Sequence, residues 1–312
     1  MTREYLKKAT RTARSDTREV EATVRAILED IEAGGEDKAL EYARKFDRYD
    51  GPVILSAEEI AAAAERVPEK LRADIRFAQD NVRRFAELQK SSIHDVQMEV
   101  VPGLVAGQKA IAVDAAGCYV PGGRYSHVAS AIMTVTTAKV AGVDHVIACS
   151  PPRPGVGIAP AIVYAAHLAG AHTILAMGGV QAVAAMAFGL FGLPKARVLA
   201  GPGNQFVAEA KRILYGRVGI DMIAGPTDSL VIADASADPR IVAADLVGQA
   251  EHGYNSPVWL VTDDRQLAEE VMALVPRLTA DLPQLNRENA EAAWRDYAEV
   301  ILCDSREEMA AT

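Results

Sequence analysis

The sequence predicts an α/β fold with two Rossmann-like lobes, each built on a parallel sheet, and an N-terminal helical arm. Between residues 116 and 225, four short apolar runs each end in Gly or Pro and lead into a segment of roughly 12–18 residues, a length that suits the crossover helix of a βαβ unit. Half of the 312 residues are hydrophobic and 24% are charged, as in a soluble globular protein. The four runs are Ala116–Val120, His145–Cys149, Thr173–Met177 and Arg197–Ala200.

The region before residue 114 is expected to mix helices and strands. Gly34-Gly35 separates two segments with helical apolar spacing, and Ser56 begins the helix-capping sequence SAEEI. Residues 1–18 are basic and polar, so they are expected to form an arm outside the core. The expected elements are helices at Glu19–Ala33, Asp37–Phe46 and Glu69–Lys90 and strands at Val96–Val101 and Gln108–Val113.

The region after residue 220 shows the same mixture of patterns. The simplest assembly is a discontinuous α/β lobe of residues 19–113 and 221–312. Residues 114–220 are inserted as a second, Rossmann-like lobe that is expected to bind a ligand. The expected elements here are strands at Ser229–Ala233, Val258–Val261 and Glu299–Cys303 and helices at Pro239–Ala250, Leu267–Leu278 and Ala290–Tyr297.

Composition and charge exclude several classes of partner. The net charge of −9 argues against nucleic acid and anionic membranes, and aromatic residues, at 5%, are too few to favour stacking on single-stranded nucleic acid. No apolar run is long enough to span a bilayer, and the N-terminus lacks the apolar segment of a signal peptide. Cys118, Cys149 and Cys303 have no CxxC spacing and indicate reduced core thiols in a cytoplasmic protein.

Three glycine turns lie where an apolar run ends and a helix is expected to begin: Gly122-Gly123, Gly178-Gly179 and Gly201-Pro202-Gly203. Unpaired N–H groups at a helix N-terminus favour anions, and glycine lets an anion approach the backbone. In an open parallel sheet these turns collect at one edge, where ligands bind. Each turn alone could be no more than a tight turn, but three at one edge predict a site for a phosphate- or sulfonate-bearing molecule.

The motif Gln249-Ala250-Glu251-His252-Gly253 falls at the end of an expected helix. Residues three apart share a helix face, so the Gln249 amide oxygen and the His252 imidazole could ligate one metal ion, with further ligands from elsewhere. A histidine near a helix C-terminus is also a common capping cation. The usual GxGxxG dinucleotide fingerprint is absent, so this pattern alone gives little support for NAD.

Five segments together resemble the histidinol dehydrogenase family and occur in that family's order. The resemblance begins near residue 20 and implies a homodimeric, zinc-containing, NAD-dependent enzyme. Such enzymes oxidise a primary alcohol to a carboxylate by two hydride transfers, through an aldehyde that stays bound. The segments are YVPGG at 119–123, GGVQAVAAMA at 178–187, GPGNQFVAEAKR at 201–212, GIDMIAGPTDSL at 219–230 and DLVGQAEHG at 245–253.

The resemblance also implies roles for individual residues. Gln249 and His252 match two zinc ligands that also contact substrate, and Thr227 replaces a substrate-contacting serine, keeping the hydroxyl and adding a methyl group. The positions that contact NAD in the family are matched by Tyr119, Gln181 and Asn204. The family's catalytic Glu-His pair and its other zinc ligands are expected beyond Thr312, so the C-terminal part of the family fold is expected to be missing from this chain and the catalytic residues are unknown.

Four further segments, at 122–143, 148–155, 186–192 and 294–309, resemble one branch of the family. That branch acts on an anionic alcohol, 2,3-dihydroxypropane-1-sulfonate (sulfopropanediol), and forms sulfolactate. Arg124 and His127 follow the first glycine turn, where a cation beside backbone N–H groups suits a sulfonate. Arg124 could instead bind the NAD pyrophosphate or lie at the surface. The alternative functions are L-histidinol oxidation in histidine biosynthesis and, from another class, a non-catalytic anion-binding α/β module.

Overall fold

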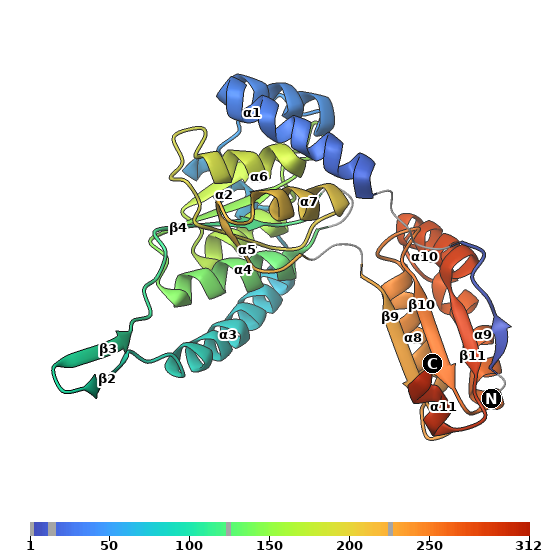
Figure 1. The fold of residues 1–312 in the computed structure, drawn as a ribbon. Coiled ribbons are helices and arrows are strands. Elements are labelled where there is room, and N and C mark those ends of the chain that lie inside the picture. The colour runs from blue at the N-terminus through green and yellow to red at the C-terminus, as the bar shows by residue number, and fades with distance from the viewer. Residues whose placement is uncertain (1–2, 12–16, 123–125, 224–226) are drawn as a thin grey trace. The chain divides into compact units, whose positions relative to one another are not determined.

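The computed structural model describes residues 3–11, 17–122, 126–223 and 227–312 of the chain. These form two compact units (Figure 1). Unit 1 contains Met1–Thr17 and Pro226–Thr312, and unit 2 contains Arg18–Gly225. Among the described residues, no helix has the length and apolar character needed to cross a membrane.

Unit 2 is built on a five-stranded sheet in the order β6-β5-β4-β7-β8. All four strand pairs are parallel, with Tyr119 opposite Cys149 and Cys118 opposite Ala200. The parallel order predicted for the four apolar runs is therefore confirmed. The strands are β4 (Ala115–Tyr119), β5 (His145–Ser150), β6 (Thr173–Ala176), β7 (Val198–Ala200) and β8 (Gly219–Ile220).

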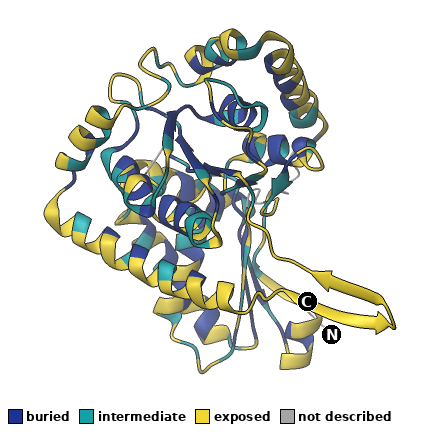
Figure 2. Cartoon of the chain, turned by 90° about the vertical axis from the view of Figure 1, so that its left-hand side faces the viewer, coloured by how far each residue is buried: buried dark blue, intermediate teal, exposed yellow. Residues whose placement is uncertain are grey.

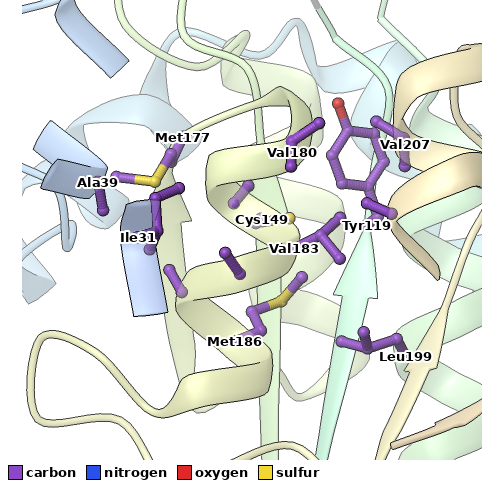
Figure 3. Close-up of a cluster of buried hydrophobic side chains, with 14 of the residues drawn as sticks. Ile31, Ala39, Tyr119, Cys149, Met177, Val180, Val183, Met186, Leu199 and Val207 are labelled. Atoms are coloured by element: carbon purple, nitrogen blue, oxygen red, sulfur yellow. The ribbon is translucent and has the colours of Figure 1, made fainter. Parts of the chain in front are cut away.

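Helices cover both faces of this sheet, and strands β4, β5 and β6 bury side chains on both sides. One face packs against α1 (Thr17–Phe46), α6 (Gly179–Phe188) and α7 (Gln205–Leu214). Figure 3 shows part of this core, where the Tyr119 ring lies among Val180, Val183 and Val207. The other face packs against α2 (Ala57–Glu65), α3 (Glu69–Ser91), α4 (Val128–Ala141) and α5 (Pro160–Ala169).

The N-terminal helices also follow the sequence patterns. Helix α1 is two helices joined at Gly35, whose φ of 61° breaks the helical geometry where Gly34-Gly35 predicted an interruption. Helix α2 begins with a complete capping box, in which Ser56 Oγ accepts from Glu59 N and Glu59 Oε2 accepts from Ser56 N.

The structure divides the chain differently from the expected domains. Residues 19–113 were expected to join 221–312, but residues 18–113 lie in the same compact unit as 114–225. The reason is packing: the apolar side of α1 completes the core beneath α6. In addition, Leu55 N donates to Ile174 O and Ala176 N donates to Val53 O, so residues 53–55 lie antiparallel beside β6.

Unit 1 contains a four-stranded sheet in the order β1-β11-β10-β9. Strands β9 (Ser229–Ala233), β10 (Val258–Thr262) and β11 (Glu299–Leu302) are parallel, as expected for this lobe. One face is covered by α8 (Pro239–Ala250), α9 (Arg265–Ala280) and α10 (Gln284–Tyr297). Helix α11 (Arg306–Ala311) contributes Met309 to a small cluster with Val261 and Ile301.

The expectation of a helical arm is wrong for the described residues at the N-terminus. Glu4–Lys7 forms strand β1, which pairs antiparallel with β11. Leu6 packs against the core of unit 1, and the Lys7 ammonium lies 5.5 Å from the centre of the Trp294 ring. Backbone pairing with β11 holds these residues in an extended conformation.

A two-stranded hairpin in unit 2 consists of β2 (Val96–Val101) and β3 (Leu104–Gln108). All its residues are exposed, as the yellow ribbon in Figure 2 shows. The second strand was expected at Gln108–Val113, but it begins at Leu104 because Pro102-Gly103, with a Gly103 φ of 83°, turns the chain at once.

Candidate functional site

The strand order of unit 2 places a topological switch point between β4 and β7. From β4, the chain leads through α4 to β5 on one side, whereas β7 lies on the other side and leads into α7. Helices α4 and α7 cover opposite faces of the sheet. Ligands of open α/β sheets bind in the crevice that such a reversal leaves at the carboxyl ends of the strands. The residues just after β4 and β7 are therefore the candidate cofactor-binding residues.

Asn204 lies at this edge as the N-cap of α7. Its Oδ1 accepts hydrogen bonds from Phe206 N at 3.0 Å and Val207 N at 3.1 Å, which satisfies two N–H groups that the helix cannot pair internally. The residue is exposed. Because Oδ1 is engaged, the Nδ2 amide group is the donor that Asn204 can offer to a ligand.

The structure brings Tyr119 and Gln181 together at the start of α6. Tyr119 is the last residue of β4, and its hydroxyl accepts a hydrogen bond from Gly179 N at 3.1 Å. Gln181 lies in the first turn of α6 and is 1% exposed. Burial raises the pKa of Tyr119 well above its ordinary value, so this hydroxyl keeps its proton at neutral pH.

Asp47 is a residue of this region that sequence reasoning missed. It follows α1, and its Oδ2 accepts hydrogen bonds from Gly178 N at 3.0 Å and Gln181 Nε2 at 3.1 Å. Asp47 and Tyr119 therefore occupy the backbone N–H groups of Gly178 and Gly179. This glycine turn was expected to bind an external anion, but the protein's own side chains already fill it.

The turn after β7 is filled in the same way. Gly201 N donates to Asp221 Oδ2 at 2.7 Å, and Lys211 Nζ donates to Gly201 O at 3.0 Å. The Lys211 ammonium, with its side chain 2% exposed, also forms an ion pair with Asp221 Oδ1. Within the described residues, this second turn is closed to an external anion at Gly201.

The remaining glycine turn, after β4, is only partly described. Gly122 O accepts from Arg153 Nε at 3.3 Å, whereas Gly123 and Arg124 lie outside the described residues. Ser150, at the end of β5, is buried, and its Oγ has no hydrogen-bond partner among the described residues. This hydroxyl lies against the position that a Cβ of Gly122 would take, so it faces the turn. His127, the residue before α4, donates its backbone N–H to Pro121 O at 3.2 Å.

The candidate metal ligands lie at the end of α8 in unit 1. Gln249 belongs to the last turn of this helix, and His252 N donates to Gln249 O at 3.1 Å just beyond it. Gln249 Nε2 donates to Thr227 O at 2.8 Å and to Thr227 Oγ1 at 3.0 Å. The structure therefore shows that Thr227 contacts Gln249, which the sequence motifs alone did not indicate.

This orientation suits a metal ligand. Both hydrogen bonds use the amide nitrogen of Gln249, which leaves Oε1 as the atom that can bind a cation. His252 is exposed, so its imidazole is accessible. Within the described residues, no group of three or more His, Cys, Asp and Glu side chains is arranged to hold a metal ion.

The cysteines do not contribute a nucleophile from the sheet. Cys118, Cys149 and Cys303 are buried and form no disulfide, as the sequence predicted. Burial raises the pKa of the Cys118 thiol to about 12 and that of Cys149 well above its usual value. Neither thiol ionises at neutral pH, so neither is a catalytic thiolate.

Comparison with known proteins supports an enzyme. The family model described as histidinol dehydrogenase matches residues 10–312. The chain is 75% identical to a sulfopropanediol 3-dehydrogenase from Ruegeria pomeroyi over 312 residues, which is all of this chain and 72% of that protein. It is 39% identical to a histidinol dehydrogenase from Parasynechococcus marenigrum, over 95% of this chain and 67% of that protein. A crystal structure of histidinol dehydrogenase from Elizabethkingia anophelis matches with a TM-score of 0.84 at 35% identity, over 97% and 69% of the two chains.

Proposed function

This chain belongs to the histidinol dehydrogenase family, and we propose that it is an NAD- and zinc-dependent alcohol dehydrogenase acting on 2,3-dihydroxypropane-1-sulfonate. The family supports an oxidoreductase. The observation that carries the substrate is the 75% identity to a relative named sulfopropanediol 3-dehydrogenase. We further propose that the enzyme is a homodimer, as the family resemblance implies.

The residues at the sheet edge fit a nicotinamide cofactor. Asn204 is exposed beside the switch point and offers an amide donor, and Ser150 supplies a buried hydroxyl without a partner among the described residues next to the turn after β4. We assign Tyr119, Gln181 and Asn204 to NAD binding. Because Asp47 and Asp221 occupy the backbone N–H groups of Gly178 and Gly201, we assign the cofactor's phosphates to the turn after β4.

Gln249 and His252 fit two ligands of a zinc ion. A bound zinc ion supplies a Lewis acid that makes a substrate hydroxyl easier to deprotonate. Thr227 holds the Gln249 amide so that Oε1 remains available, and the accessible His252 imidazole supplies the nitrogen. Near this pair, the added methyl group of Thr227 narrows the space for substrate relative to a serine.

The proposed reaction converts the primary alcohol to a carboxylate in two oxidations. One alcohol, two NAD⁺ and one water give one carboxylate, two NADH and three protons. The aldehyde formed by the first hydride transfer adds water before the second transfer and stays bound between the two. We assign Arg124, which lies outside the described residues, and His127 to the sulfonate because a guanidinium suits such an anion.

Steady-state NADH formation by the full-length protein with zinc tests this function. We expect turnover with sulfopropanediol and two NADH formed per diol consumed. Turnover with L-histidinol alone would reassign the substrate and keep the family. If the protein binds neither zinc nor NAD and oxidises neither alcohol, it is an anion-binding module instead.

Asn204 has a structural role and a proposed cofactor role, and two substitutions separate them. Asn204→Ala removes the helix cap and should cost about 1 kcal/mol of stability. Asn204→Ser keeps a capping oxygen but loses the amide donor, so its free energy of unfolding should stay near that of the wild type. Both variants should raise the KM for NAD roughly fivefold to tenfold if the amide contacts the cofactor. A wild-type KM in the Asn204→Ser variant would restrict Asn204 to capping.

A further inference from the structure

Asp47 connects a distant part of the chain to the proposed cofactor site. It lies 131 residues from Gly178 and 134 from Gln181, yet one oxygen, Oδ2, accepts from both Gly178 N and Gln181 Nε2. The other oxygen, Oδ1, lies close to the position that a Cβ of Gly178 would take. The carboxyl group is therefore held against the first turn of α6.

This arrangement determines how the Gln181 amide is oriented. An ionised carboxylate only accepts hydrogen bonds, so the nitrogen of the amide must face Asp47. The amide oxygen, Oε1, must then point away from Asp47. It lies against the space that a Cβ of Gly179 would fill, 2.9 Å from that position, and no donor meets it among the described residues.

We propose that Asp47 is a positioning residue for NAD, which holds the Gln181 amide so that its oxygen accepts a hydrogen bond from a donor group of the cofactor. This inference rests on the proposed function. NAD carries suitable donors in its ribose hydroxyls and carboxamide group. Asp47 acts through Gln181 and does not itself contact the cofactor.

Asp47 is only half-buried, but the desolvation of its carboxylate opposes folding, which favours a role beyond stability. Burial raises the pKa of the Asp47 carboxyl, although the bonds from Gly178 and Gln181 oppose this effect. The folded state therefore binds the proton more tightly than the unfolded state, and stability decreases as pH rises through the raised pKa. Tyr119 and Cys149 also face this carboxylate, but burial keeps both neutral at pH 7. Replacing the carboxylate with a neutral group of the same shape should consequently raise the Tm at pH 7.

Two variants separate positioning from stability. In Asp47→Asn, the Gly178 N–H requires an oxygen at the Oδ2 position, so both hydrogen bonds can persist and the Gln181 orientation is kept. We expect its Kd for NAD to stay within about threefold of the wild type, with a higher Tm. Asp47→Ala removes both bonds and should weaken NAD binding roughly tenfold, with a lower Tm.

Calorimetric titration of the full protein with NAD measures these constants, and thermal melting measures the Tm. Asp50→Ala is the matched control, because this exposed carboxylate in the same loop pairs with Arg44. It should bind NAD like the wild type.

If Asp47→Ala does not fold, Asp47→Glu replaces it, since the longer side chain cannot keep the oxygen in place. The double variant Asp47→Ala with Gln181→Met should have the same Kd for NAD as Gln181→Met alone, because Asp47 acts through Gln181.

The outcomes distinguish this inference from the proposed function. If the wild type does not bind NAD, the proposed function fails and the inference fails with it. Wild-type binding with an unchanged Kd in Asp47→Ala would overturn the inference alone. A lower stoichiometry at unchanged Kd would overturn it too, because a structural defect reduces the amount of folded protein without changing its affinity.

Discussion

His252→Ala should remove most of the bound zinc and lower turnover by roughly a hundredfold or more. The imidazole is one of two proposed ligands among the described residues, and its loss leaves the Gln249 oxygen alone at this end of α8. Because His252 is exposed, truncating it leaves no cavity, so the fold should persist. Metal analysis, steady-state turnover and circular dichroism measure the three quantities.

His94→Ala is the matched control, since it removes an exposed histidine that has no proposed role. It should keep both zinc and activity. Full zinc occupancy in a folded His252→Ala protein would show that His252 is not a ligand. The histidine at the helix end would then be a capping cation, which was the alternative interpretation of the motif.

Local patterns predicted the elements of this fold well. Strands ending in glycine, the Ser56 capping box and the break at Gly35 each depend on a few adjacent residues, so the sequence displays them directly. The domain boundary was not predictable in this way. It depends on α1 packing beneath α6 and on residues 53–55 pairing with β6, which are contacts between segments more than a hundred residues apart.

The same limit applies to the candidate site. The sequence indicated Gln249 and His252 as a possible pair of ligands because they share one helix end, whereas the role of Asn204 came only from the family resemblance. It did not identify Asp47, or Asp221 as the acceptor for Gly201 N. In sequence, a glycine turn looks the same whether an external anion or an internal carboxylate binds its N–H groups. The family resemblance assigned roles to Tyr119 and Gln181 but did not indicate that both are buried.

The second large effect concerns the ion pair between the buried Lys211 and the partly exposed Asp221 of unit 2. Asp221→Ala should destabilise the protein by about 3–5 kcal/mol, because it leaves the Lys211 ammonium buried without a counter-charge. Gly201 N–H loses its acceptor in the same variant. At about 2–4 °C per kcal/mol for a unit of this size, the Tm should fall by roughly 10 °C. Circular dichroism during thermal unfolding measures this change.

Two further variants isolate the buried charge as the cause. Asp74→Ala removes an exposed carboxylate from α3 and should change stability by no more than about 0.5 kcal/mol. Lys211→Met combined with Asp221→Ala removes both charges from the pair. A buried apolar side chain then replaces the unpaired ammonium, so the double variant should be about 1–2 kcal/mol more stable than Asp221→Ala. Equal stability of the single and double variants would show that the lost hydrogen bond to Gly201, and not the unpaired ammonium, accounts for the destabilisation.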